Sequence, residues 1–307
     1  MAGQERRYDI DWLRVLAMLM IFFFHCARFF DRDGWQVKNP ELSFGFTVFV
    51  AVVAQFIMPL FFLLSAMSTW YALGRRTNRE YLGERFKRLV VPLIFGIFVI
   101  VPPQVYLERF SQGPFNGSFF GFLPHYFDGL YGFGGNFPWM GLHLWYLEML
   151  FLFSLITLPL FRFLQTGSGQ GFVSRVAGLC AKPGGALLFV IPIALMEMLV
   201  NIQPKGIGFR DFGGWSPLTY LVFFLLGAVM SADPRFRKGV ERGMIPALAL
   251  LIVTTIAGVS PVDLRGFIAR TGLCAFARRQ FLVLAGRDPR LRGEVPELFE
   301  RMPTVCE

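Results

Sequence analysis

The chain alternates between long apolar runs and short polar links. In the first run, residues 15–24 are all apolar, and the apolar character continues through Cys26 and Ala27. Runs of this length are typical of membrane helices. The pattern predicts an all-α fold, a polytopic transmembrane helix bundle with about seven spans. The expected spans cover residues of about 12–30, 43–73, 89–107, 141–161, 184–201, 215–231 and 244–259.

Composition supports a membrane protein, since 54% of the 307 residues are hydrophobic and 37 are Phe. The net charge of +9 comes from short basic clusters between the apolar runs. The positive-inside rule distributes Lys and Arg in this way, so no nucleic acid partner is expected. With the N-terminus in the cytoplasm, most Lys and Arg of the links fall on the cytoplasmic side. The four cysteines show no CxxC spacing and no His/Cys cluster, and no metal site is predicted.

Two ionisable residues lie on the first predicted span. Arg14 and His25 are eleven residues apart, which at about 100° per residue returns to nearly the same face, roughly 16 Å further along. Ionisable groups within a span are costly, so they usually face a cavity or a partner. Alternatively, Arg14 extends to the lipid headgroups and His25 makes one structural hydrogen bond. The shared face favours a functional interpretation. In the predicted orientation Arg14 lies near the cytoplasm and His25 nearer the outer face.

The C-terminal stretch departs from this pattern. Residues 261–307 contain eight Arg, no Lys and no apolar run long enough to span a membrane. The predicted organisation is a membrane-embedded domain at 1–259 and a basic tail at 260–307. The tail suggests a chain that is truncated, or read in another frame after about residue 259.

Four stretches resemble the acyltransferase-3 family of membrane-bound O-acyltransferases, and most closely its branch of periplasmic-glucan succinyltransferase-like proteins. They match the family's Arg-x10-His signature, its Phe-Phe-x-x-Ser-Gly turn, its basic segment before the third span and its His-Leu-Trp-Phe-Leu element. In this sequence the four are Arg14 with His25, residues 61–66 with Ala66 in place of Gly, residues 85–92, and residues 143–147. The resemblance covers roughly residues 7–258. Family members usually have about ten spans.

The resemblance implies an acyltransferase that moves an acyl group from cytoplasmic acyl-CoA to a hydroxyl of an envelope or extracellular glycan or related acceptor. It implies acyl-CoA as a donor substrate, no bound cofactor, and a place in the lipid bilayer of the bacterial inner membrane. The resemblance leaves the acyl group open among acetyl, succinyl and longer groups. Two alternatives remain: a transporter or flippase of a glycan or lipid precursor, or an inactive truncated fragment. An acyltransferase consumes donor thioester when acceptor is present, whereas a transporter moves solute without chemistry.

The same resemblance assigns roles to residues. A hydroxyl needs a general base to attack a thioester, and His suits neutral pH. His25 is the expected base, or else a nucleophile that carries the acyl group transiently. Arg14 is expected to hold part of the donor or to act on His25 through its charge. Arginine forks suit phosphate oxygens, and the predicted donor-binding residues are Arg85, Lys87 and Arg88 at the family's motif together with Arg75 and Arg76. For Arg75 and Arg76, a plain positive-inside anchor is the alternative.

A last group is predicted at the outer end of the fourth span. His143, Trp145 and Glu148 are expected to orient the acceptor or to assist proton transfer. An interfacial aromatic belt, which Trp145 and Tyr146 would fit, is the alternative. Ser65 is interpreted as a helix-packing residue because no base lies beside it in the sequence.

Overall fold

The computed structural model describes residues 8–35, 37–113, 115–126, 142–182, 184–205, 207–210 and 213–258. These residues form helices and turns, and no strand occurs among them. The chain divides into two compact units, Met1–Gly243 and Met244–Glu307. Of the second unit, the described residues are 244–258, which continue helix α12. The prediction of an all-α helix bundle is confirmed.

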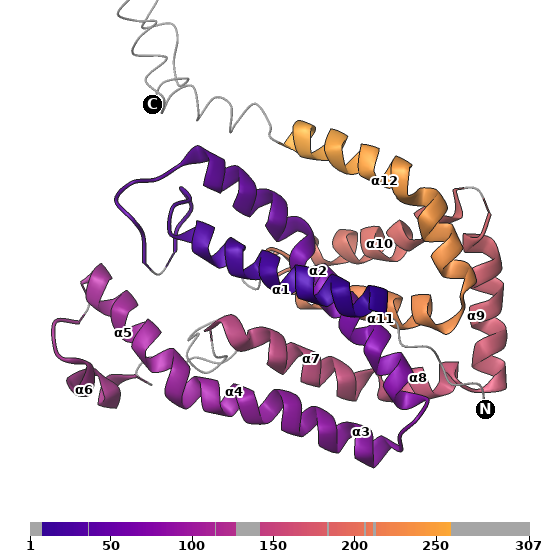
Figure 1. Cartoon of the computed structure of the whole chain (residues 1–307), viewed down its shortest axis with the longest axis horizontal. Helices are drawn as coiled ribbons and strands as arrows, with labels where there is room; N and C mark the ends of the chain where they lie inside the picture. Colours follow the sequence, from indigo (N-terminus) through magenta and orange to yellow (C-terminus); the bar gives the residue numbers. More distant parts are fainter. Residues whose placement is uncertain are drawn as a thin grey trace, which may run out of the picture. The chain divides into compact units, whose positions relative to one another are not determined.

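The described helices are labelled in Figure 1. In chain order they are α1 (Tyr8–Arg28), α2 (Phe44–Leu73), α3 (Asn78–Arg85), α4 (Val91–Phe95), α5 (Val101–Gln112), α6 (Phe119–Phe122), α7 (Trp145–Ile156), α8 (Leu158–Leu164), α9 (Gly167–Cys180), α10 (Val190–Val200), α11 (Pro217–Ala232) and α12 (Arg235–Gly258). Two π-helical turns, η1 (Phe86–Val90) and η2 (Gly96–Ile100), join α3, α4 and α5 into one long helix. Short 3-10 turns are η3 (Leu123–His125), η5 (Leu142–Leu144) and η6 (Gly185–Phe189).

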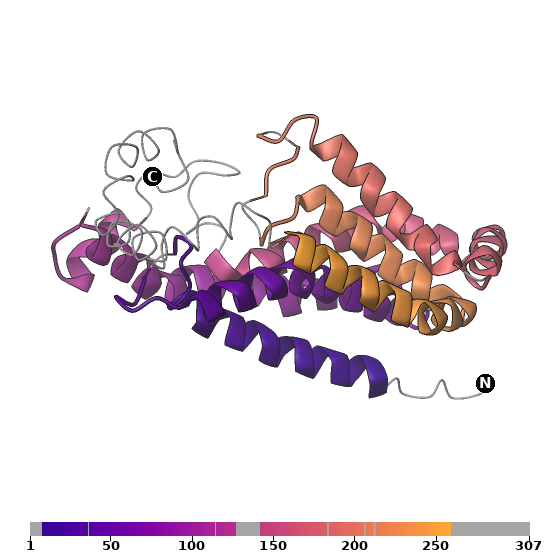
Figure 2. The ribbon, with the colours of Figure 1, turned by 90° about the horizontal axis from the view of Figure 1, so that it is seen from above.

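Helix α2 is the central element of the first unit. It packs against α1 on one side and most extensively against α11 on the other, and α10 lies beyond α11. Figure 2 shows α1 and α10 on opposite sides of this arrangement. Helix α7 contacts α2, α11 and η1. It therefore packs on the inner side of the bundle. Helix α9 runs across the ends of the other helices (Figures 1 and 2).

The outer face of α1 carries large exposed apolar side chains. Trp12, Leu16 and Phe22 are among them, while Ala17 on the opposite face is buried against α2. Exposed apolar side chains on a long helix suit contact with lipid, since the bilayer core is as apolar as they are. The inward face of α1 therefore carries the side chains that can serve a site.

The predicted number of spans differs from the structure. Among the described residues, three helices are long and apolar enough to cross a membrane, Tyr8–Arg28, Phe44–Leu73 and Asn78–Ser111. The number is five if the bent pairs Leu142–Ile156 with Leu158–Leu164 and Pro217–Ala232 with Arg235–Pro246 each count as one span. The run expected at 184–201 begins with the turn η6, which leaves α10 with 11 residues. Such a helix is about 16 Å long, roughly half the thickness of the hydrocarbon core.

Two predicted boundaries are also corrected. Much of the basic link expected at 74–88 is helical, because Thr77 and Glu80 form a capping box that starts α3 at Asn78. The helix that contains the last predicted span, expected from 244, begins at Arg235, whose backbone N–H donates to the Asp233 carboxylate. The predicted boundary after residue 259 and the basic tail at 260–307 lie outside the described residues, so both stay predictions.

Close packing of α11 on α2 depends on Gly227. A Cβ atom at this position would lie 2.2 Å from the backbone oxygen of Leu63. We expect Gly227→Ala to destabilise the bundle by about 1–3 kcal/mol, because backbone atoms cannot move aside as a flexible side chain can. Thermal unfolding of the purified protein in detergent measures this effect.

The matched control is Gly83→Ala on α3, where a Cβ atom would meet nothing within 4 Å. This control is expected to be neutral or slightly stabilising, because alanine favours helix over glycine. Equal unfolding temperatures for the two variants would contradict the role assigned to Gly227.

Candidate active site

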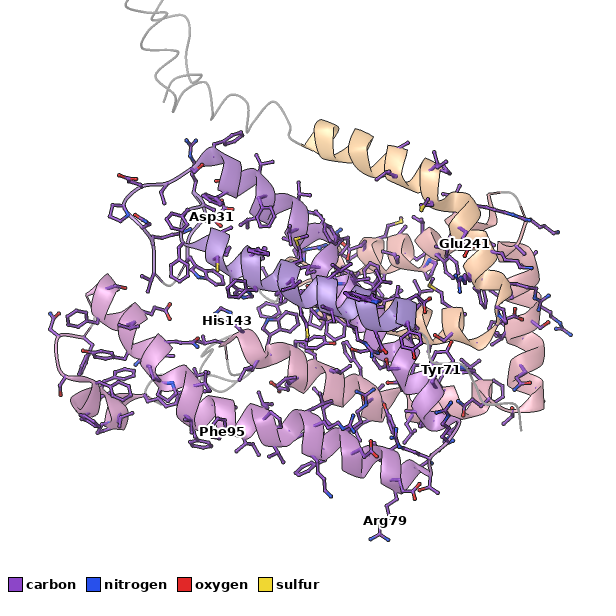
Figure 3. All side chains as sticks on the ribbon, in the orientation of Figure 1. Asp31, Tyr71, Arg79, Phe95, His143 and Glu241 are labelled. Atoms are coloured by element: carbon purple, nitrogen blue, oxygen red, sulfur yellow. The ribbon has the colours of Figure 1, made fainter. Side chains whose placement is uncertain are left out.

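Two imidazoles meet between the first helix and the start of α7. The ring centroids of His25 and His143 are 4.6 Å apart, and the rings meet edge to face. Figure 3 labels His143, which lies between α1 and the beginning of α7. Both histidines were candidates in the sequence analysis, but nothing in the sequence indicated that they would touch. We call these two residues the imidazole pair.

The tautomer of His25 follows from its hydrogen bond. Its Nδ1 lies 2.8 Å from the backbone oxygen of Ile21, one turn earlier in α1. A carbonyl oxygen only accepts, so Nδ1 carries the proton and donates it. In the neutral ring Nε2 then holds the lone pair, and it makes no hydrogen bond to any described residue. His25 is thus oriented as a base with a free nitrogen.

His143 is presented by an unusual backbone conformation. Leu142, immediately before it, has a φ of 49°, in the left-handed region that side chains rarely adopt. Its side chain is buried with Val101, Val105, Phe122 and Tyr126. Burial of Leu142 therefore supports a strained turn, of the kind often found at functional sites. Within the described residues the imidazole of His143 makes ring contacts and no hydrogen bond, so its nitrogens are open to a ligand.

A third ring completes the site from the link after α1. The indole of Trp35 stacks on His143 with centroids 5.4 Å apart and an interplanar angle of 21°. It also lies 6.2 Å from the ring of His25. The guanidinium of Arg28 sits over the same indole, 4.3 Å from its centroid. The sequence analysis treated this link only as a polar connection.

A hydroxyl pair lies one turn along α7 from His143. The hydroxyl of Tyr146 is 2.5 Å from Oγ of Ser65 on α2, and it also donates to the backbone oxygen of Phe61 at 3.2 Å. Tyr146 follows His143 by three residues, with His143 on the turn η5 and Tyr146 in the first turn of α7. Among the described residues, Ser65 has a tyrosine beside it and no base, and its interpretation as a helix-packing residue stays a prediction.

Two arginines from different helices reach the same segment of α2. Arg14 donates to the backbone oxygen of Leu64 at 3.2 Å and pairs with Asp11 at 3.6 Å. Arg85 donates to the hydroxyls of Thr69 and Tyr81. Both arginines therefore reach residues 64–69 of α2, and Arg14 lies roughly 16 Å along α1 from His25.

The predicted donor-binding residues differ in how far they are buried and in which elements they face. Arg85 is half-buried and faces α2, whereas Lys87 and Arg88 are exposed. Arg76 pairs with Glu84 at 3.2 Å, and Arg88 lies 3.8 Å from the same carboxylate. Arg75 is exposed in the turn after α2. Within this group, Arg85 reaches the segment of α2 that Arg14 also contacts.

The three residues predicted for the acceptor are separated in the same way. His143 joins His25, whereas Trp145 is buried in the core against Phe62 and Tyr220. Glu148 lies in the first turn of α7, five residues after His143 on the turn η5. It is half-buried and makes no ion pair or hydrogen bond with a described residue. Acceptor roles for Trp145 and Glu148 stay predictions.

The sequence analysis missed Trp35 and Tyr146. Tyr146 could have been found from its three-residue spacing to His143 on a predicted helix. Trp35 could not, because its contact depends on how the link after α1 folds back. Among the described residues, no group of three His, Cys, Asp or Glu side chains is arranged to hold a metal ion.

Taken together, the described geometry provides a base at one end of a polar track and two guanidiniums at the other. The base is His25, the middle of the track is Tyr146 with Ser65, and the cations are Arg14 and Arg85. Such a track can remove a proton from one substrate while it holds the negative charge of another.

Comparisons with known proteins relate the chain to a family. The profile described as "Acyltransferase domain" matches residues 7–292. Glucans biosynthesis protein C of Escherichia coli (strain SMS-3-5 / SECEC) is 25% identical over 263 residues, which cover 81% of this chain and 65% of that protein. The protein of the same name from Salmonella schwarzengrund (strain CVM19633) is 22% identical over 236 residues, covering 75% of this chain and 59% of the relative. The aligned region is thus 65% or less of the length of these relatives. No solved structure matches the chain.

Proposed function

Because the chain belongs to the acyltransferase domain family, we propose that it is a membrane-bound O-acyltransferase that uses cytoplasmic acyl-CoA to acylate a hydroxyl of an envelope or extracellular glycan. One observation carries the proposal. His25 donates through Nδ1 to Ile21, which leaves Nε2 as a base, and the ring touches His143. The relatives' name refers to glucan biosynthesis, which supports a glycan as the acceptor.

In the proposed reaction, the acyl group moves from the thioester sulfur of acyl-CoA to the hydroxyl oxygen of the acceptor. Nε2 of His25 takes the proton of the acceptor hydroxyl while that oxygen attacks the thioester carbonyl. A new C–O ester bond forms, and the C–S bond to coenzyme A breaks. The leaving thiolate is protonated, in net terms by the proton that His25 removed. His143 is assigned to the acceptor, since its nitrogens have no hydrogen-bond partner among the described residues.

The cationic end of the track is assigned to the donor. Arg14 and Arg85 approach the same segment of α2, and guanidinium groups bind phosphate and carbonyl oxygens well. The donor is proposed to enter from the cytoplasmic side, with its acyl end directed along Tyr146 toward His25. This arrangement requires the N-terminus in the cytoplasm and the imidazole pair nearer the outer face of the bacterial inner membrane. The distribution of Lys and Arg in the links supports that orientation.

Labelled acyl-CoA tests the function directly. Membranes that contain the chain are incubated with radiolabelled acetyl-, succinyl- or longer acyl-CoA and with envelope glucan, beside membranes without the chain. The expected result is label on the glucan that depends on the chain. Movement of glucan across the membrane without label would support a transporter. Neither label nor movement, with the chain inserted and folded, would refute the proposed activity of this chain.

Donor binding by Arg85 makes a separate prediction. We expect Arg85→Gln to raise KM for acyl-CoA by about tenfold or more, because a hydrogen bond from a charged group contributes about 1.5–3 kcal/mol. Lys87→Gln, two residues away and exposed, removes the same charge and is the matched control. Initial rates measured across acyl-CoA concentrations give both values. An equal rise in KM for the two variants would indicate general attraction of the anionic donor and would contradict a specific role for Arg85.

A further inference from the structure

The link between α1 and α2 is built around a buried carboxylate. Asp31 is fully buried, with 0% of its surface exposed. Its carboxylate accepts hydrogen bonds from Arg28 at 2.5 Å, from Lys38 and from the backbone N–H of Asp33 at 3.0 Å. A buried carboxylate is costly unless it is fully paired, and this one has two cations and a backbone donor. The link is therefore held in one conformation by charge.

The same cations fix the link onto the end of α1. Lys38 also donates to the backbone oxygens of Arg28 at 2.7 Å and of Asp31 at 3.0 Å. Arg28 donates through its other amino group to the backbone oxygen of Gly34 at 2.6 Å. Gly34 immediately precedes Trp35, so the backbone that carries the indole is held directly. Figure 3 shows Asp31 near the end of α1, on the side from which this link departs.

The link places Trp35 on the imidazole pair. The indole is covered by the guanidinium of Arg28, with 4.3 Å to its centroid, and stacks on His143 at 5.4 Å. Because both groups lie over the ring, the indole is already engaged and is not a free stacking surface for a sugar. Since His143 makes no hydrogen bond to a described residue, its orientation depends on contacts with the rings of Trp35 and His25.

We propose that Trp35, held by the cluster of Arg28, Asp31 and Lys38, is a positioning residue that sets the orientation of His143 against His25. This inference rests on the proposed function only for its catalytic consequence. The part that does not depend on the function is structural: the polar link after the first helix controls the accessibility and geometry of the imidazole pair. Trp35 acts through His143 and touches neither substrate.

Histidine modification tests the structural content without any activity measurement. The chain has three histidines, His25, His125 and His143. Diethyl pyrocarbonate carbethoxylates each imidazole, and mass spectrometry of the full chain in membranes gives the three rates. Trp35→Ala is expected to raise the rate at His143 by about tenfold, the upper end for loss of an aromatic pair. His125, on the 3-10 turn η3, is the internal control and should not change.

Conservative variants separate positioning from unfolding. Trp35→Phe keeps a stacking ring and should retain the rate of the unmodified chain at His143. Asp31→Asn keeps the shape of the side chain but removes its charge, and it should raise the rate at His143 toward that of Trp35→Ala. An unchanged rate at His143 in Trp35→Ala would overturn the proposal. A similar rise at all three histidines would overturn it too, because it would indicate general loosening.

The kinetic consequence is tested separately. If the chain transfers acyl groups, Trp35→Ala should lower kcat about tenfold with KM for acyl-CoA unchanged, since the donor is assigned to the other end of the track. Trp35→Phe should restore most of kcat. A change confined to KM for acyl-CoA would contradict a positioning role at the imidazole pair. The modification result stands even when no transfer is detected, so failure of the proposed function and failure of this inference are distinguishable.

Discussion

Replacement of His25 by glutamine is expected to lower kcat for acyl transfer by about 10²–10⁴-fold, the usual contribution of a general base. Glutamine keeps a polar side chain on the inward face of α1 and can still donate to the backbone oxygen of Ile21, but it cannot accept the hydroxyl proton. KM for acyl-CoA should change little, because the guanidiniums proposed to bind the donor lie at the other end of the polar track. Initial rates with labelled acyl-CoA and saturating glucan measure kcat directly.

The control for His25→Gln is His125→Gln, which removes a histidine from the turn η3 and leaves the imidazole pair intact. Its kcat is expected to match that of the unmodified chain. A His25→Gln variant that folds and retains full kcat would exclude His25 as the base.

The two chemical roles considered for His25 give different results without acceptor. If His25 acts as a base, incubation with labelled acyl-CoA alone leaves the protein unlabelled. If it carries the acyl group, label appears on the protein, is lost when glucan is added, and is absent from His25→Gln. The hydrogen bond from Nδ1 to Ile21 leaves Nε2 available for either role. Rapid quenching followed by mass spectrometry of the peptide that contains His25 distinguishes them.

Loss of the Arg14 charge is expected to lower kcat/KM for acyl-CoA by about 10²-fold, as removal of a positioned charge-stabilising donor often does. In Arg14→Gln, the hydrogen bond to the backbone oxygen of Leu64 weakens and the cation on this segment of α2 disappears. Arg14→Lys keeps the charge without the planar fork, so partial recovery is expected. Rates across acyl-CoA concentrations at saturating glucan measure the effect.

Arg79→Gln is the matched control for Arg14→Gln. Arg79 points away from the helix in Figure 3 and is exposed, so loss of its charge should leave kcat/KM nearly unchanged. If the two glutamine variants lose activity equally, the basic residues act by general attraction of the donor and Arg14 has no specific place in the site. Ionic strength separates these cases further, because salt screens exposed charges more than partly buried ones.

The helix bundle could be anticipated from the sequence because apolar runs report directly on the surrounding medium. A segment such as 15–24 has no favourable place other than lipid or a protein core. Helix ends were harder to predict, since they depend on caps and turns. The capping box at Thr77 starts a helix within the link predicted at 74–88. The turn η6 takes up the start of the span predicted at 184–201 and shortens its helix.

The sequence by itself determined that Arg14 and His25 lie on one face of the first helix, because helical periodicity is a local property of the backbone. It also determined the apolar helices that surround them. The tertiary structure decided which residues meet that face: His143 against His25, Tyr146 against Ser65, and Trp35 against His143. These contacts join α1, α2, α7 and a polar link across long sequence separations. They depend on how the helices pack and how the link folds back, so no local pattern in the sequence could predict them.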